Sequence, residues 1–314
     1  MSRLKKIVIA LAVLVFAPPL AVVGYIVILS FFNGHIGVAT DYTNSPMLQS
    51  PPPVLTAPVT LKLVTFNIQD TPVVGKDRPD RMRAIAAKLT ILDPDVVCFQ
   101  ESFIEADRAL LVESLADSRL VHHQYYESGR GSGLLLSSAW PIAETWFHRY
   151  TVANPWYCVW EGDWWAGKGV SLARIALPEG PVDIYNTHAQ ADYGKEAYQR
   201  IQEAQMGELA AFVNGSTLKT APAFSLGDFN VKDGEAGYAR LVTEANLERV
   251  MAVPSRIDHV FAVKNPHYSF EVVASEEIQE QVTVNGKEFS LSDHNGYMTT
   301  VRVAPVPAAE GAGT

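Results

Sequence analysis

The stretch FSLGDFN, residues 224–230, changes from apolar to polar within a few positions. Its first part is typical of a buried β-strand, and Asp228 and Asn230 follow where that strand ends. Active-site groups concentrate at such positions, where a rigid scaffold carries them. A single Asp or Asn at a strand end is more often an ordinary terminator, so the pattern gains meaning only if other strands end in the same way.

Five further apolar segments lead into polar residues, namely Asn67, Glu101, His188, Asp258 and the pair Asp293–His294. Each has an ordinary explanation on its own, but six in one chain indicate a common site. Carboxylate and amide oxygens without thiolates suit a hard cation such as Mg²⁺. A histidine held by a carboxylate can take a proton from water. Together these groups predict metal-assisted hydrolysis of a phosphodiester.

The rest of the pattern alternates short β-branched or aromatic runs with helical periodicity. Helices are expected over residues 78–92, 105–118 and 196–215. Strands are expected over 59–68, 95–101, 133–138, 170–177, 182–188, 222–230, 256–263, 267–274, 282–291 and 296–303. This alternation predicts an α/β fold in one domain, with a two-layered sheet core flanked by helices.

The ordered series TFNIQD, FQES, NTH, GDFN, RIDH and SDH resembles the endonuclease/exonuclease/phosphatase superfamily. Within it, the neutral sphingomyelinase branch is the most similar, through NIQDTP, RPDRM, ESGRGSGLLLSS, EGDWWAGKGV and YNTHAQADY. The resemblance runs from about residue 60 to 303. It implies a four-layer α/β/β/α sandwich of the DNase-I-like type and a phosphoric diester hydrolase. The catalytic domain is therefore expected over residues 59–304, followed by a disordered tail over 305–314.

The resemblance also implies a role for each matching residue. For the metal, Mg²⁺ or alternatively Mn²⁺, it implies Glu101 as principal ligand, Asn67 beside it and Asp293 nearby. For the chemistry, it implies His294 as general base with Asp258 orienting it, His188 as donor to a phosphate oxygen, and Asp228 and Asn230 as the groups that orient water and phosphate. The sequence departs from some relatives at Gln100 and at His259, where an aromatic residue is common; neither change removes a required group.

Four of the six tryptophans lie between residues 156 and 165, in a polar, glycine-containing segment. Indole rings settle at the headgroup level of bilayers, so Trp164 and Trp165 are predicted to contact a membrane. In an extended segment the two would point to opposite sides, with one packed and one free. By resemblance, Asp163 and Lys168 help to switch the site on; Lys168 could instead bind a lipid phosphate or be an ordinary solvated lysine.

The N-terminus carries a membrane signal. Arg3, Lys5 and Lys6 precede an uncharged apolar run over residues 7–32, and about 20 such residues cross a bilayer. We expect a transmembrane signal anchor, with residues 1–6 cytoplasmic and the catalytic domain extracytoplasmic by the positive-inside rule. A cleaved signal peptide is the alternative. Residues 33–58, rich in Pro, Ser and Thr, are expected to form a tether.

The charge of the body narrows the substrate class. Beyond residue 40 the chain has 22 Lys and Arg against 34 Asp and Glu, a net charge of −12. Such a body is poorly suited to nucleic acid, and a phospholipid or sphingolipid at a membrane is the expected substrate of a monomeric enzyme. A nuclease or phosphomonoesterase of the same superfamily is the alternative function. Whether Cys98 and Cys158 pair is open.

Overall fold

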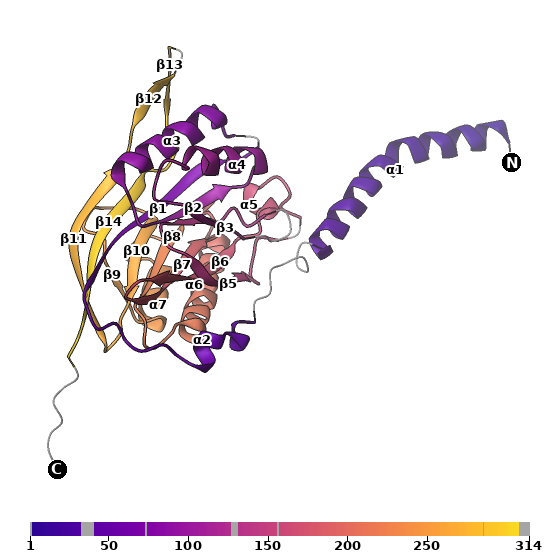
Figure 1. Ribbon diagram of the computed structural model, residues 1–314. Helices are drawn as coiled ribbons and strands as arrows, with labels where there is room; N and C mark the ends of the chain where they lie inside the picture. The colour runs from indigo at the N-terminus through magenta and orange to yellow at the C-terminus, as the bar shows by residue number, and fades with distance from the viewer. Residues whose placement is uncertain are drawn as a thin grey trace.

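Two six-stranded β-sheets pack face to face at the centre of the molecule (Figure 1). The structure is a computed structural model that describes residues 2–32, 41–72, 74–126, 131–155, 157–284 and 286–307. In spatial order, the first sheet consists of β11 (Tyr268–Ile278), β14 (Gly296–Pro305), β1 (Val59–Asp70), β2 (Val96–Ser102), β4 (Leu135–Ser138) and β3 (His122–Tyr125). The second consists of β5 (Ile142–Arg149), β6 (Gly169–Leu177), β7 (Gly180–His188), β8 (Ala223–Asp228), β10 (Asp258–Val263) and β9 (Leu247–Arg249).

Each sheet contains one parallel pair of strands, and these pairs decide where polar residues gather. β1 is parallel to β2, and β7 is parallel to β8. A parallel connection needs a crossover, which α3 (Arg78–Leu92) provides in the first sheet and α6 (Glu196–Ser216) in the second. The carboxyl ends of both strands in each pair therefore lie at one edge of their sheet.

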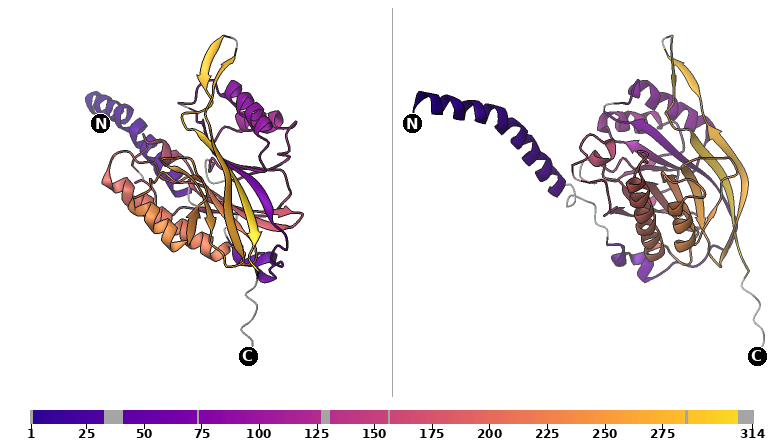
Figure 2. Two further views of the ribbon diagram at one scale, coloured as in Figure 1. Left: turned by 90° about the vertical axis from the view of Figure 1, so that its left-hand side faces the viewer. Right: turned by 180° about the vertical axis from the view of Figure 1, so that it is seen from behind.

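Helices cover the outer face of each sheet (Figure 2). α3 and α4 (Glu105–Ser114) contribute Met82, Ile85 and Leu111 to a buried cluster with Phe66 of the first sheet. α6 and α7 (Ala236–Glu244) pack in the same way on the second sheet. A third cluster fills the space between the sheets. Each fully buried side chain of this kind contributes roughly 1.5–3 kcal/mol. The predicted α/β fold with two packed sheets is confirmed.

The first helix, α1, extends from Arg3 to Phe32, with Pro18 and Pro19 inside it. Within the described ranges, no helix combines the length and apolar character that crossing a bilayer requires. The anchor over residues 7–32 therefore stays a prediction. Of the expected tail, residues 308–314 lie outside the described part.

Residues 41–58 are part of the folded domain, which corrects the predicted tether over 33–58. They contain η1 (Tyr42–Asn44) and α2 (Pro46–Gln49). Ser45 is buried and its Oγ donates to Glu144 Oε2 at 2.7 Å, while the Tyr42 ring packs edge-on against Phe212 at 5.5 Å. Leu55 is buried between the sheets. The Pro- and Ser-rich composition concealed these separate anchoring contacts.

Two smaller features complete the fold. α5 (Gly162–Trp165) is a single turn within the tryptophan segment, and the hairpin of β12 (Gln281–Val284) and β13 (Lys287–Ser290) projects from the end of β11 (Figure 1). Cys98 and Cys158 are both buried free thiols, so the open question of their pairing is answered in the negative.

His259 is a buried histidine of the second sheet. Its ring lies 5.2–5.7 Å from the ring centroids of Phe229, Tyr238 and Phe261. Its Nε2 lies 2.9 Å from the carbonyl oxygen of Val231. Burial lowers the pKa of His259 to about 4. The departure from an aromatic residue at this position therefore makes stability depend on pH.

We expect His259 to reduce the free energy of unfolding by about 3 kcal/mol between pH 7 and pH 4. The unfolded chain takes up this proton near the ordinary pKa of 6.5, whereas the folded chain resists protonation until about pH 4. The contribution is thus present above pH 6.5 and is lost as the pH falls. Denaturant unfolding of the wild type and of His259→Phe tests it; parallel curves of stability against pH would contradict it.

Candidate active site

The registers of the second sheet place three of the predicted residues side by side. His188 at the end of β7 pairs with Asp228 at the end of β8, and Asp228 pairs with Asp258 at the start of β10. Directly paired residues project from the same face of a sheet. The three side chains therefore face the first sheet together, at the edge where the parallel strands end.

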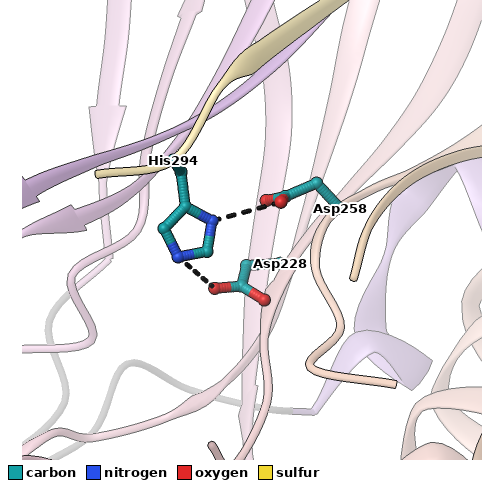
Figure 3. Close-up of side chains that lie close together, drawn as sticks. All are labelled: Asp228, Asp258 and His294. Carbon is teal, nitrogen blue, oxygen red and sulfur yellow. Dashed lines mark hydrogen bonds and ion pairs between the residues drawn. The ribbon is translucent and has the colours of Figure 1, made fainter. Parts of the chain in front are cut away.

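His294 lies between two of these carboxylates (Figure 3). Its Nδ1 is 3.1 Å from Asp258 Oδ2, and its Nε2 is 3.8 Å from Asp228 Oδ2. Asp258 is 5% exposed, so its carboxylate can hold the ring in one orientation away from bulk water. A general base and its orienting carboxylate require this geometry, and those roles of His294 and Asp258 stay a prediction.

The first sheet supplies Asn67 and Glu101 to the same place. Asn67 Nδ2 donates to Glu101 Oε1 and to Asp228 Oδ2, both at 3.0 Å. His188 Nε2 lies 4.0 Å from Glu101 Oε1 and 3.5 Å from Asp228 Oδ2. Asp228 thus joins the histidines to the carboxylate and amide of the other sheet. Residues from strand ends of both sheets converge in one site.

Asp293 and Asn230 lie at the margin of this group. Asp293 Oδ2 accepts a hydrogen bond from Gln69 Nε2 at 2.6 Å, and its charge raises the pKa of His294. Asn230 N donates to Asp228 Oδ1 at 3.1 Å, while its amide Nδ2 donates to the carbonyl of Ala189. In this conformation Asn230 braces the site through its backbone, and its predicted contact with phosphate stays a prediction.

Backbone strain marks the strand ends that carry these groups. Gln69, Glu101 and Asn230 have φ angles of 47°, 59° and 54°, in the left-handed region. Such conformations cost non-glycine residues of order 1–3 kcal/mol each and are held by the surrounding fold. The pairing of β1 with β2 also shifts register between Asn67 and Asp70. These local distortions turn polar side chains out of the ladder and toward the site.

The carboxylates are crowded in a poorly solvated place. Burial, followed by the charge of Asp258, raises the pKa of Asp228 to about 7. Burial also raises the pKa of Glu101. Asp228, Asp258 and His294 each offer a ligand atom, and these atoms lie within 4.8 Å of one another. Buried carboxylates whose ionisation is unfavourable suit a bound divalent cation, which compensates their charge.

The donor chemistry shows which residues fit such a cation. His294 Nδ1 is already engaged by Asp258, and a hard cation prefers oxygen to imidazole nitrogen. Asp228 and Glu101 form the neighbouring pair of carboxylates, linked by the Asn67 amide nitrogen; Asn67 Oδ1 accepts from the backbone N–H of Gln69 at 3.1 Å, so Asn67 would offer its oxygen to a cation only with its amide turned over. The ligand roles of Glu101 and Asn67 stay predictions, and Asp228 is the carboxylate that lies beside both of them. Asp293 lies close enough for its charge to raise the pKa of Glu101.

The two histidines are in opposite electrostatic states. Burial tends to lower the pKa of His294, but the hydrogen bond to Asp258 and the charges of Asp228 and Asp293 raise it to about 10. Burial and the charge of Lys168 hold the pKa of His188 well below its ordinary value. His188 is therefore neutral near pH 7, whereas His294 keeps its proton until the carboxylates around it are compensated.

Lys168 is part of the site and is not a solvated loop lysine. It is 6% exposed, and its Nζ lies 2.8 Å from Asp163 Oδ1 and 2.9 Å from His188 Nε2. It also donates to the carbonyl of Ala189 at 2.6 Å. Asp163 in turn accepts from the backbone N–H of Ala191. With Lys168 donating to Nε2, the ring proton of His188 lies on Nδ1, which is buried without a partner among the described residues; donation from Nε2 to a phosphate requires the other tautomer.

The tryptophan segment differs from the prediction. Trp164 and Trp165 belong to the helical turn α5 rather than to an extended segment, and their rings meet edge-on at 4.7 Å. Trp164 is 7% exposed, and Trp165 Nε1 donates to the carbonyl of Val159 at 2.7 Å. Trp160 is instead 73% exposed. The prediction that one of the adjacent pair is free is wrong, because a helical turn brings both rings together.

Two supporting residues escaped the sequence analysis. Gln69 holds Asp293, as described above. Ser292 Oγ donates to the backbone carbonyl of Asn67 at 2.7 Å and accepts from the N–H of His294 at 3.3 Å. Ser292 thus ties the loop that carries His294 to β1. Its place directly before Asp293–His294 was the only available signal, and a loop serine is too common to be diagnostic.

Comparison with known proteins identifies the family of this chain. Residues 64–294 match the Endonuclease/Exonuclease/phosphatase family, a span that includes every strand-end residue of the site. The chain belongs to that family. Residues 127–130 of the motif ESGRGSGLLLSS lie outside the described part, so the structure says nothing of that portion of the resemblance.

Curated relatives are similar over part of their length. The chain is 30% identical over 206 residues to the inositol phosphosphingolipids phospholipase C of Schizosaccharomyces pombe, covering 63% of this chain and 48% of that protein. It is 31% identical over 183 residues to sphingomyelin phosphodiesterase 2 of Homo sapiens, covering 58% of this chain and 43% of that protein. The chain thus spans about half the length of these two relatives.

Solved structures show the same fold. Sphingomyelinase C from Streptomyces griseocarneus superposes with a TM-score of 0.59 at 21% identity, covering 77% of this chain and 99% of that one. A mutant of beta toxin from Staphylococcus aureus with bound magnesium ions gives a TM-score of 0.59 at 20% identity, covering 78% and 99%. The family prediction and the fold shared with sphingomyelinases are confirmed.

We expect Mg²⁺ to raise the melting temperature of the chelator-treated protein by about 5–10 °C at a concentration a hundred times its dissociation constant. The reason is that a bound cation compensates carboxylates that are unfavourably ionised in the folded state alone. Differential scanning fluorimetry of the full chain measures the shift. Asp228→Asn should abolish most of it, whereas Asp80→Asn on the exposed face of α3 should not. An equal shift in all three proteins would contradict the site.

Proposed function

We propose that this family member is a Mg²⁺-dependent phosphodiesterase of the phospholipase C type, acting on the headgroup of a sphingolipid or phospholipid. The observation that carries the proposal is the position of His294, held by Asp258 and facing Asp228 beside the Asn67–Glu101 pair. The similarity to a phospholipase C and to a sphingomyelin phosphodiesterase supports the lipid substrate.

Hydrolysis follows from the arrangement of these groups. His294 Nε2 takes a proton from water, whose oxygen forms a bond to phosphorus while the bond from phosphorus to the lipid oxygen breaks. Asp258 holds the ring through Nδ1 and stabilises the imidazolium. The lipid alkoxide receives a proton and leaves as an alcohol. Lys168 places positive charge beside His188, where negative charge builds up on the phosphoryl oxygens.

The cation would be held by Glu101, Asn67 and Asp228, with Asp293 nearby. When bound, it neutralises charge on the phosphoryl oxygens and the leaving oxygen. The magnesium in the related beta toxin structure supports Mg²⁺, although Mn²⁺ has similar ligand preferences. A cation held there would offset the charge of Asp228, one of the groups that raise the pKa of His294 to about 10, and His294 accepts a proton only when its Nε2 is unprotonated.

Location at a membrane is part of the proposal. Residues 7–32 act as a signal anchor with residues 1–6 in the cytoplasm and the catalytic domain outside, and the enzyme is a monomer. Trp160 and Tyr157 expose 73% and 54% of their surface next to α5, which carries Asp163. Aromatic side chains at this level favour the bilayer interface, and the net charge of −12 beyond residue 40 disfavours nucleic acid.

In the decisive assay the full chain is incubated with mixed-lipid vesicles and, separately, with plasmid DNA, each in the presence of Mg²⁺ and of EDTA. We expect release of a phosphorylated headgroup that EDTA abolishes. His294→Ala should reduce the rate by roughly 10²–10⁴-fold without changing the far-ultraviolet circular dichroism spectrum. Nicking of DNA without lipid turnover would replace the proposal by a nuclease, and near-normal turnover by the variant would refute the base.

Trp160→Ala should lower activity on vesicles by more than threefold while leaving activity on a soluble short-chain lipid unchanged, because an exposed ring contributes only where a bilayer is present. Trp164→Ala is the matched comparison. Its ring is buried, so the loss should appear as roughly 3–5 kcal/mol of stability and affect both substrates. Equal losses on both substrates for Trp160→Ala would contradict a role at the membrane.

A further inference from the structure

Arg149, the last residue of β5, is an arginine without a counter-ion near the active site. Its Nη1 is buried and has no hydrogen-bond partner. Burial lowers its pKa, and no carboxylate among the described residues offsets that effect. Burying a cation without a partner is costly, and folded proteins normally pair such groups. Arg174, a buried arginine of the same sheet, follows that rule through Asp183 and Glu144.

The alternation along β5 shows which way Arg149 projects. Trp146 and Tyr150 lie in the cluster beneath α6, and His148 contacts Glu208 of that helix. Phe147 lies in the cluster between the sheets. Successive side chains of a strand point to opposite faces. Arg149 therefore projects toward the first sheet, on the same face as His188 and Asp228.

The strand registers put Arg149 in the row of the active site. Arg149 pairs with Gly169, Gly169 with His188, and His188 with Asp228. Arg149 is thus two strand spacings from His188, roughly 10 Å. A Cβ at Gly169 would lie 2.3 Å from the carbonyl oxygen of His148 and 2.7 Å from the Phe147 ring, so the edge of that ring, and no side chain of residue 169, lies between the two residues in that row.

Negative and positive side chains occupy different parts of this row. Asp228 and Asp258 lie at one end, where the water and the cation are expected, and Lys168 contacts His188 in the middle. Arg149 lies beyond them, at the other end. A phosphodiester bound at His188 would direct one of its two substituents toward Arg149. Because Arg149 is partly exposed, that substituent can reach it from solvent.

We propose that Arg149 forms a headgroup subsite that binds acceptor oxygens beyond the scissile phosphate and so selects headgroups bearing hydroxyl or anionic groups over quaternary ammonium ones. A guanidinium offers donors in a planar fork suited to paired oxygens. A trimethylammonium group offers no acceptor and repels a neighbouring cation. This inference rests on the proposed phospholipase C function and names its substrate class.

The test compares two sphingolipids, one with a phosphoinositol and one with a phosphocholine headgroup, each dilute in the same neutral detergent micelles. Arg149→Met keeps much of the length of the side chain and removes the charge. We expect it to lower kcat/KM on the phosphoinositol lipid at least tenfold, mainly through KM, with less than a threefold change on the phosphocholine lipid. Arg149→Lys should retain part of the preference.

Arg83→Met, on the exposed face of α3, is the control and should change neither substrate. Equal losses on both lipids, or no loss on either, would overturn the inference, as would a wild-type preference for phosphocholine. If the wild type hydrolyses neither lipid, the proposed function fails instead. The subsite is then tested by ligand binding. It is supported if inositol 1-phosphate raises the melting temperature of the wild type more than phosphocholine does and if Arg149→Met removes that difference; any other result contradicts it.

Discussion

The site depends on one buried carboxylate. Asp228 is 1% exposed, yet it accepts from Asn67, faces both His188 and His294, and receives the backbone N–H of Asn230. A carboxylate in such surroundings is stable only if hydrogen bonds and positive charge compensate it. The charge of the neighbouring Asp258 makes ionisation of Asp228 still less favourable. Burial between the two sheets raises the pKa of Asp228, and the charge of Asp228 adds to the hydrogen bond with Asp258 that raises the pKa of His294 against the effect of burial.

The resulting electrostatic field has a direction. Carboxylates gather where β8, β10 and β14 meet, while Lys168 and Arg149 lie toward the edge strand β5. A phosphodiester is a single anion between two substituents, so a field of this kind orients it as well as binding it. Water activation would then occur at the Asp228 and Asp258 end of the row, which His294 faces, and headgroup selection at the Arg149 end. This separation lets headgroup preference change without altering the base.

The segment around α5 connects this chemistry to the surface. Asp163, within α5, holds Lys168 against His188, and Trp164 and Trp165 pack against each other in the same turn. Trp160, which is 73% exposed, lies just before it. A contact made by Trp160 at a membrane could therefore be transmitted to the position of Lys168 through only a few residues. Membrane contact was predicted for Trp164 and Trp165 because the sequence does not show that these residues form a helical turn.

The sequence by itself determined the α/β class, the helices α3, α4 and α6, the strands that carry the site, and the identity of the groups at strand ends, because these depend on periodicity and on residues close together in the chain. Asn67, Glu101, His188, Asp228, Asp258 and His294 were all identifiable in this way. The sequence did not show β3, β5, β9 or α7, and the single strand expected over 282–291 is the hairpin of β12 and β13. Only the tertiary structure decided which of them share hydrogen bonds, that residues 41–58 join the domain, and that Lys168 is buried. It also revealed the unpartnered Arg149, whose meaning depends on a register across four strands. These contacts and registers join residues that are far apart in the chain, so they cannot be predicted from local sequence patterns.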